Sequence, residues 1–234
     1  MHKVLINPEV EAKIRARRGG DTHVFQSLDA KKTALVVIDL QDGFMDPQYP
    51  TAVAEAPGIV PNVNRLAAAL RDKGGTVVWV YMTFDESSVR TWSTFMTEFA
   101  TPQMRAGLMD SMGTGRPGTK LWHALDLRPE DPIVAKKRFS AFIPGSSDID
   151  ALLKSRGIDT LLIAGTLTNV CCESTARDAS MMNYRTVFLS DGTAAPNDEL
   201  HNATLTALIE LFCDIMTTDE CVARLGQRRA AAAE

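Results

Sequence analysis

The chain has 234 residues, 45% of them hydrophobic, and a formal net charge of −4 at pH 7. This size and apolar content are typical of one globular domain with a sizeable core, and the net charge gives no reason to expect a nucleic-acid partner. No apolar stretch approaches the roughly 18 residues that span a bilayer, and the first residues lack the apolar segment of a signal peptide. We therefore expect a cytoplasmic protein with neither a membrane nor a nucleic-acid partner.

The cysteines support a reducing compartment. Their positions have no metal-ligand spacing, and a chain of this length does not need a disulfide scaffold. They are Cys171, Cys172, Cys213 and Cys221.

The chain starts with an arm, residues 1–30, which we expect to be helical over 8–18 until Gly19-Gly20 ends it. Beyond the arm, short runs that are apolar on both faces alternate with amphipathic segments. Such runs are typical of buried parallel strands, and the alternation predicts helices on both faces of one sheet. The expected strands are Thr33–Ile38, Thr76–Val80, Pro132–Ala135, Thr160–Ala164, Thr186–Leu189 and Asp214–Thr217.

These elements predict an α/β fold of three layers, α/β/α, around a mostly parallel, six-stranded, Rossmann-like sheet. The expected helices carry apolar stripes within 63–70, 149–153 and 200–211. We expect this domain to span 31–227, followed by a disordered tail at 228–234.

Residues 83–130 are too long for an ordinary crossover between strands. Within them, Trp92, Phe95, Met96 and Phe99 recur at i, i+3, i+4 and i+7, which predicts one helix. Such a stripe most often faces the core, and a pocket wall or a subunit contact are the alternatives.

Three reactive side chains, Asp39, Lys136 and Cys171, each follow one of the expected strands. Ligands of open α/β sheets bind beyond the carboxyl ends of the strands, so we expect these side chains to lie together. A carboxylate can accept the proton of a thiol and later give it to a leaving amine. A neighbouring ammonium group stabilises both negative charges.

Cys171 lies in the stretch Gly165-Thr-Leu-Thr-Asn-Val-Cys171-Cys172-Glu-Ser-Thr175, between an expected strand and an expected helix. The first turn of a helix offers unpaired N–H groups and the positive end of the helix dipole. We therefore predict a thiol that ionises readily, beside amides that can hold an oxyanion. A Cys–His dyad is the weaker alternative, with His201 as its candidate.

These residues resemble the motifs of the isochorismatase-like cysteine hydrolase superfamily, in family order from about residue 30 to residue 220. The first-strand motif resembles Ala34-Leu-Val-Val-Ile-Asp39-Leu-Gln41, the lysine motif resembles Lys136-Lys-Arg-Phe-Ser140-Ala-Phe142, and the nucleophile motif resembles residues 165–179.

The resemblance implies that Asp39 is the general base, Lys136 its electrostatic partner and Cys171 the nucleophile. It also implies a cis peptide between Thr166 and Leu167. The oxyanion hole would then consist of the N–H groups of Leu167 and Cys171.

Two departures from family patterns narrow the expected activity. Nicotinamidases of this superfamily carry an Asp-x-His metal motif after the second strand, where this chain has Tyr81-Met-Thr-Phe84, so we expect no bound metal. Isochorismatases, which cleave a vinyl ether, lack the cysteine. The string from Thr168 to Asp178 most resembles the ureidoacrylate and N-carbamoylsarcosine amidohydrolases.

We therefore expect a cofactor-free amidohydrolase that cleaves the C–N bond of a small linear amide, ureido or carbamoyl compound through a thioester and releases ammonia. Trp92 and Phe142 are predicted to wall the pocket, and Asn169 and Arg138 to meet polar groups of the substrate. Members of the superfamily are commonly dimers or tetramers. We accordingly expect a homodimer or homotetramer, with the arm and the 83–130 insert as candidate contacts.

Three alternatives stay open. The first is an ether hydrolase of the isochorismatase type that uses Asp39 without the thiol. The second is a binding or scaffold protein that kept the fold. The third is a redox protein with a disulfide between Cys171 and Cys172, although vicinal cysteines form strained disulfides. We interpret Cys172, at a position that is usually Val in the family, as a packing residue.

Overall fold

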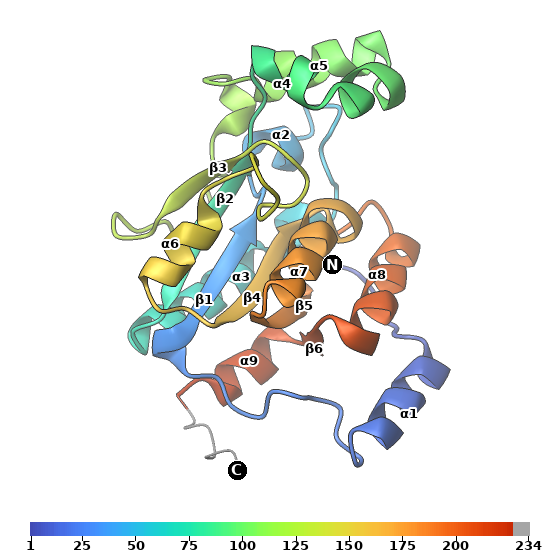
Figure 1. Ribbon diagram of the computed structural model, residues 1–234, viewed down its shortest axis with the longest axis vertical. Helices are drawn as coiled ribbons and strands as arrows, with labels where there is room; N and C mark the ends of the chain where they lie inside the picture. The colour runs from blue at the N-terminus through green and yellow to red at the C-terminus, as the bar shows by residue number, and fades with distance from the viewer. Residues whose placement is uncertain (227–234) are drawn as a thin grey trace.

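The computed structural model describes residues 1–226, so the expected tail at 228–234 lies outside the described residues. Within them, six strands form one sheet in the order β3-β2-β1-β4-β5-β6 (Figure 1). Every neighbouring pair is parallel, which confirms the predicted α/β fold with its six-stranded central sheet. The strands are β1 Thr33–Ile38, β2 Thr76–Met82, β3 Ile133–Lys136, β4 Thr160–Thr166, β5 Arg185–Ala194 and β6 Asp214–Met216.

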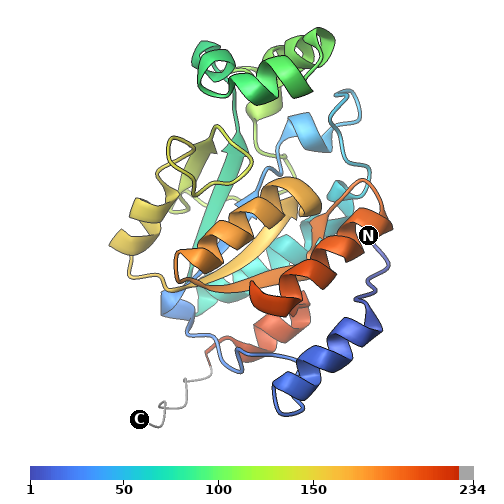
Figure 2. The same ribbon diagram turned by 45° about the vertical axis from the view of Figure 1, so that its right-hand side comes forward.

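Helices cover both faces of the sheet because successive side chains of each strand point to opposite sides. Along β1, Leu35 and Val37 pack in one apolar layer, with α3 and α9, whereas Val36 and Ile38 pack in the other, with α6, α7 and α8 (Figures 1 and 2). The bounds are α3 Ala56–Asp72, α6 Ile149–Ser155, α7 Glu173–Met181, α8 Asp198–Leu211 and α9 Thr218–Arg224.

The N-terminal arm packs on the outside of α8 through α1, Pro8–Arg17 (Figure 2). Asn7 caps this helix, since its side chain accepts hydrogen bonds from the first backbone N–H groups. Ile14 is buried in the layer shared with α8. The arm then leads through the short 3₁₀ helix η1, Ala30–Lys32, into β1.

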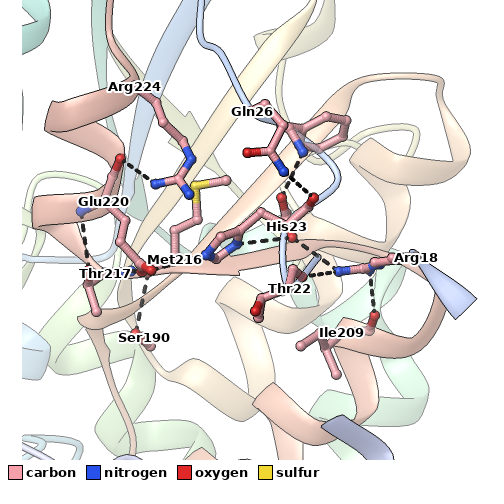
Figure 3. A network of polar contacts seen from close by, with 12 residues as sticks. Arg18, Thr22, His23, Gln26, Ser190, Ile209, Met216, Thr217, Glu220 and Arg224 are labelled. Carbon is pink, nitrogen blue, oxygen red and sulfur yellow. Dashed lines mark hydrogen bonds and ion pairs between the residues drawn. The ribbon is translucent and has the colours of Figure 1, made fainter. Parts of the chain in front are cut away.

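A polar network holds the second half of the arm against the edge strand β6 and the helix α9 (Figure 3). His23 Nε2 lies 3.0 Å from a carboxylate oxygen of Glu220 on α9, and His23 Nδ1 lies 3.4 Å from Asp214 Oδ1 on β6. Arg18 donates a 3.1 Å hydrogen bond to the carbonyl oxygen of Ile209. The arm is therefore tied to elements almost 200 residues away in sequence.

Residues between β2 and β3 form a helical lobe that projects beyond the carboxyl end of the sheet (Figure 1). The lobe consists of α4 Glu86–Thr91, the π-helix η2 Thr94–Phe99 and α5 Pro102–Met112. Two short elements lie beneath it, α2 Asp42–Met45 and the 3₁₀ helix η3 Pro117–Thr119.

The helix expected within 92–99 is present as the π-helix η2, and part of its apolar stripe faces inward. Met96 is fully buried, but Phe99 is 78% exposed. Trp92, Phe95 and Met96 pack in one apolar cluster, and only Phe99 lies away from it, because the turn of a π-helix is wider than that of an α-helix. In residues 1–226, no helix combines the length and the apolar character needed to cross a membrane.

Candidate active site

The order of strands brings the three candidate catalytic residues to one edge of the sheet. Asp39 directly follows β1, and Cys171 lies in the π-helix η4, Thr168–Cys172, just after the neighbouring β4. Lys136 is the last residue of β3, which is separated from β1 by β2. The strand order changes direction between β1 and β4, the point at which ligands of open α/β sheets bind.

Asp39 and Lys136 form an ion pair that is completely shielded from solvent. Lys136 Nζ lies 2.8 Å from Asp39 Oδ2, and both side chains are 0% exposed. The ammonium group also donates a 3.0 Å hydrogen bond to the carbonyl oxygen of Arg138 and lies 3.7 Å from Met82 Sδ, so it passes over β2 to reach Asp39. A buried ammonium group therefore has both a counter-charge and a hydrogen-bond acceptor.

The backbone holds Asp39 in an uncommon conformation. Its φ is 57°, in the left-handed region, which side chains other than glycine rarely adopt. Its N–H donates a 2.8 Å hydrogen bond to the carbonyl oxygen of Val80 on β2. Such conformations persist where the surrounding structure enforces them, and they concentrate at functional sites.

Burial sets the protonation behaviour of this pair. It raises the pKa of Asp39 above its ordinary value, and the opposing influences of Lys136 and the Cys171 thiol do not cancel that rise. For Lys136, burial favours the neutral amine, but Asp39 and Cys171 together outweigh burial and raise its pKa. Lys136 is thus a cation at neutral pH and supplies the positive charge of the site.

The prediction of a readily ionised thiol is wrong for the resting structure. Burial raises the pKa of Cys171 to about 12; Lys136 opposes this rise and Asp39 adds to it. The side chain is only 2% exposed, so desolvation of the thiolate outweighs the helix terminus that the sequence suggested. A thiol of this kind needs a base to remove its proton during the reaction, and Asp39 is the neighbouring carboxylate.

The loop before Cys171 depends on a glycine and contains a cis peptide. Gly165, with a φ of 120°, passes so close to β1 that a Cβ atom on it would lie 1.9 Å from the carbonyl oxygen of Ile38. The peptide bond between Thr166 and Leu167 is cis, at the position that the family resemblance gives. The close approach of β4 to β1 brings the loop beside Asp39.

The four residues predicted to contact substrate do not lie in one place. Trp92 and Arg138 line one groove, which Phe139 and α7 also border. The guanidinium of Arg138 lies 5.1 Å from the centre of the Trp92 ring and donates hydrogen bonds to the carbonyl oxygen and hydroxyl of Thr91. These hydrogen bonds hold the Arg138 side chain against the lobe.

Phe142 and Asn169 lie elsewhere. Phe142 is only 7% exposed and packs with Tyr184, with ring centres 5.5 Å apart, in the apolar layer that also contains Cys171. Phe142 does not border the groove of Trp92. Asn169 belongs to η4, and its buried Oδ1 has no hydrogen-bond partner among the described residues. A partnerless buried oxygen beside Cys171 is available to a ligand.

His201, the candidate of the alternative Cys–His dyad, makes its hydrogen bonds to Thr168 and Ser190. It is 0% exposed, and its two ring nitrogens lie 3.0 Å from the hydroxyl of Thr168 and 3.0 Å from the carbonyl oxygen of Ser190. Burial, followed by the neighbouring His2, lowers the pKa of His201 to about 4. Sequence reasoning missed these contacts, because nothing in the spacing of the chain pairs position 168 with position 201.

No group of three or more His, Cys, Asp or Glu side chains in residues 1–226 is arranged to hold a metal ion. At the place of the nicotinamidase metal motif, Met82 contacts Lys136, and Phe84 packs in an apolar cluster with Phe44. Cys172 is fully buried in the layer that contains α7, consistent with a packing role.

A three-layer α/β fold with these polar residues at the carboxyl edge of its sheet defines the class of isochorismatase-like hydrolases. The family model for the isochorismatase domain matches residues 33–220, and the chain belongs to this family. A probable inactive nicotinamidase of Arabidopsis thaliana is 32% identical over 177 residues, which cover 75% of this chain and 87% of that protein.

Solved structures agree with this assignment. A cysteine hydrolase from Pseudomonas syringae pv. phaseolicola 1448A superposes with a TM-score of 0.74 at 26% identity, covering 86% of this chain and 96% of the other. An N-carbamoylsarcosine amidase from Thermoplasma acidophilum superposes with a TM-score of 0.63 at 25% identity, covering 80% and 97%. The chain is therefore similar in fold and sequence to hydrolases that include an amidase.

Proposed function

We propose that this protein is a cysteine amidohydrolase that cleaves the C–N bond of a small linear amide, ureido or carbamoyl compound and releases ammonia. The observation that carries the proposal is the solvent-free ion pair of Asp39 and Lys136 beside the Cys171 thiol. A buried base, a fixed cation and a thiol together meet the needs of acyl transfer. The N-carbamoylsarcosine amidase among the structural relatives supports the same substrate class.

In this mechanism, Asp39 accepts the thiol proton as Cys171 Sγ attacks the carbonyl carbon. The new S–C bond moves an electron pair onto the carbonyl oxygen, and the N–H groups of Leu167 and Cys171 hold that oxyanion. Lys136 keeps Asp39 ionised before this step and balances negative charge during it. Because the resting thiol has a raised pKa, proton transfer and attack on the substrate are expected to be coupled.

The tetrahedral intermediate collapses when its C–N bond breaks. Asp39 gives its proton to the departing nitrogen, which leaves as ammonia, and a thioester on Cys171 remains. Water then attacks the thioester while Asp39 accepts a proton from it. The second collapse returns an electron pair to sulfur, the proton returns to Cys171, and the carboxylic acid is released; a carbamoyl thioester yields carbamic acid, which decomposes to carbon dioxide and ammonia.

Trp92 and Arg138 offer an aromatic surface and a cation to the substrate from a groove that none of Asp39, Lys136 and Cys171 lines. The free Oδ1 of Asn169 offers an acceptor for the N–H of an amide or ureido group. Phe142 is expected to support the nucleophile loop, residues 165–171, because its nearly buried side chain packs in the same apolar layer as Cys171. No cofactor or metal is part of this mechanism.

The test is ammonia release from a panel of primary amides, ureido acids and carbamoyl amino acids. Wild type is compared with Cys171→Ala, and with Cys172→Val as the matched control at the adjacent thiol. We expect turnover of at least one compound, a loss of about 10³-fold or more in Cys171→Ala, and near-normal turnover in Cys172→Val. Full activity in Cys171→Ala would exclude the covalent mechanism, and cleavage of a vinyl ether by that variant would favour the ether hydrolase.

A further inference from the structure

Two histidines from opposite ends of the chain stack against each other behind the nucleophile loop. His2 of the arm lies parallel to His201 of α8, with ring centres 4.4 Å apart and an interplanar angle of 20°. The His2 side chain is 2% exposed although it belongs to the arm, and His201 is 0% exposed. His2 lies outside residues 33–220, which match the family domain.

The hydrogen bonds of His201 determine which of its nitrogens carries the proton. The carbonyl oxygen of Ser190 only accepts, so His201 Nε2 carries the hydrogen and donates over 3.0 Å. Nδ1 is then the acceptor, and the hydroxyl of Thr168 donates to it over 3.0 Å. This arrangement needs a neutral imidazole, in agreement with the pKa of His201, which burial and then His2 lower to about 4.

His2 is fixed by a second, complementary set of bonds. The N–H of Ala195 donates to His2 Nε2 over 2.9 Å, so Nδ1 carries the hydrogen toward Asp198 Oδ1, 2.7 Å away. Ala195 follows β5, and the carbonyl oxygen of Ala194 accepts a 3.1 Å hydrogen bond from the hydroxyl of Thr166. The arm is thus connected to the nucleophile loop along two routes.

Both routes end on neighbours of Leu167. One runs from His2 through His201 to Thr168, and the other from His2 through residues 194–195 to Thr166. Leu167 is the residue whose N–H belongs to the oxyanion hole in the proposed mechanism. A displacement of about 1 Å in such a group can reduce a rate by about 10²-fold.

We propose that His2 and His201 are positioning residues, which hold Thr166 and Thr168 and thereby fix the oxyanion-hole amide of Leu167. The catalytic part of this inference rests on the proposed function. The arm then contributes to turnover without contacting the substrate, and its removal is expected to lower kcat more than it raises KM, because the lost interaction acts in the transition state.

The experiment compares His2→Ala and Thr168→Val with Thr168→Ser, which keeps the hydroxyl donor. Asn7→Ala is the matched control, because it removes the cap of α1 but leaves the stacked rings and the hydrogen bonds of His2 in place. Two quantities are measured: kcat and KM on an amide that wild type hydrolyses, and amide hydrogen exchange within 167–172.

We expect His2→Ala and Thr168→Val to lower kcat by about tenfold or more with KM within about twofold. Exchange within 167–172 should accelerate by a similar factor. Thr168→Ser should restore both values, and Asn7→Ala should change neither.

The inference is overturned if His2→Ala and Thr168→Val leave exchange within 167–172 at the level of Asn7→Ala. It is also overturned if exchange rises in these variants but kcat stays at the level of the control. Hydrogen exchange requires no substrate. Failure of every compound in the panel would therefore count against the proposed function alone, while exchange would still decide whether His2 orders the loop.

Discussion

Two adjacent lysines offer a direct comparison of a buried and a partly exposed ion pair. Lys136 pairs with Asp39 at 2.8 Å with both side chains 0% exposed, and Lys137 pairs with Asp85 at 2.6 Å with side chains 41% and 29% exposed. Replacing Lys136 with methionine leaves a carboxylate in a site without water, which costs about 3–5 kcal/mol of the free energy of unfolding. The same change at Lys137 should cost about 0–1 kcal/mol, because solvent screens that pair.

The loss in Lys136→Met should also depend on pH. Without the cation, the pKa of Asp39, already raised by burial, rises further. A carboxyl group with a raised folded-state pKa stabilises the protein below its unfolded pKa, and this stabilisation is lost as pH rises through the folded pKa. Lys136→Met should therefore be less destabilised at pH 5 than at pH 8, whereas Lys137→Met should show little change.

Urea unfolding followed by circular dichroism, at both pH values, measures these free energies. The double variant Asp39→Asn/Lys136→Met should recover part of the loss, because it contains no unpaired buried charge. Equal losses in Lys136→Met and Lys137→Met, or a single-variant loss that does not depend on pH, would refute this account of the site.

Three further measurements test other features. Gly165→Ala should lower the free energy of unfolding by more than about 3 kcal/mol, because the new Cβ would meet the backbone of Ile38. Gly107→Ala is the control, since a Cβ there meets open space, and it should be neutral or stabilising. Similar losses for both variants would contradict the steric argument. The carboxylate of Asp214, 3.4 Å from His23 Nδ1, raises the pKa of His23 despite burial, so the stability advantage of wild type over His23→Gln in urea unfolding should be complete below pH 6.5 and decline as pH rises through the folded pKa. Finally, kcat/KM should fall on the acid side with a midpoint above 3.8, since Asp39 must be unprotonated to act as base; a pH–rate profile with a lower midpoint would exclude that role.

The sheet was largely predictable because strands buried on both faces are continuous apolar runs. The expected Thr33–Ile38 strand coincides with β1. The end of β5 was not predictable in this way. Its second half, from Ser190 to Ala194, is polar, and its pairing with β4 shifts register between Ile163 and Gly165 before it resumes. Such an extension follows from neighbouring strands and not from local composition.

The site was predictable only in part. The positions of Asp39, Lys136 and Cys171 at strand ends followed from the order of the elements, but the raised pKa of the thiol did not, because burial depends on the whole fold. The contact between His2 and His201 joins residues 199 positions apart, and no local sequence pattern predicts it. The catalytic roles, the oxyanion hole and the oligomeric state stay predictions.

The left-handed backbone at Asp39 limits which substitutions the chain can accept there. Gly, Asn and Asp are the residues that tolerate this conformation, but of these only Asp carries a carboxylate. In a library randomised at position 39, the backbone would accept all three, but only Asp supplies the counter-charge of the buried Lys136, so selection for folding at neutral pH would also favour Asp. Asn differs from Asp by one side-chain atom and suits the same backbone, but it leaves the Lys136 ammonium without its counter-charge. Asn or Gly at position 39 therefore preserves the fold best when position 136 is also uncharged. Relatives that have lost activity by this route should carry Asn or Gly at the position of Asp39 together with an uncharged residue at the position of Lys136.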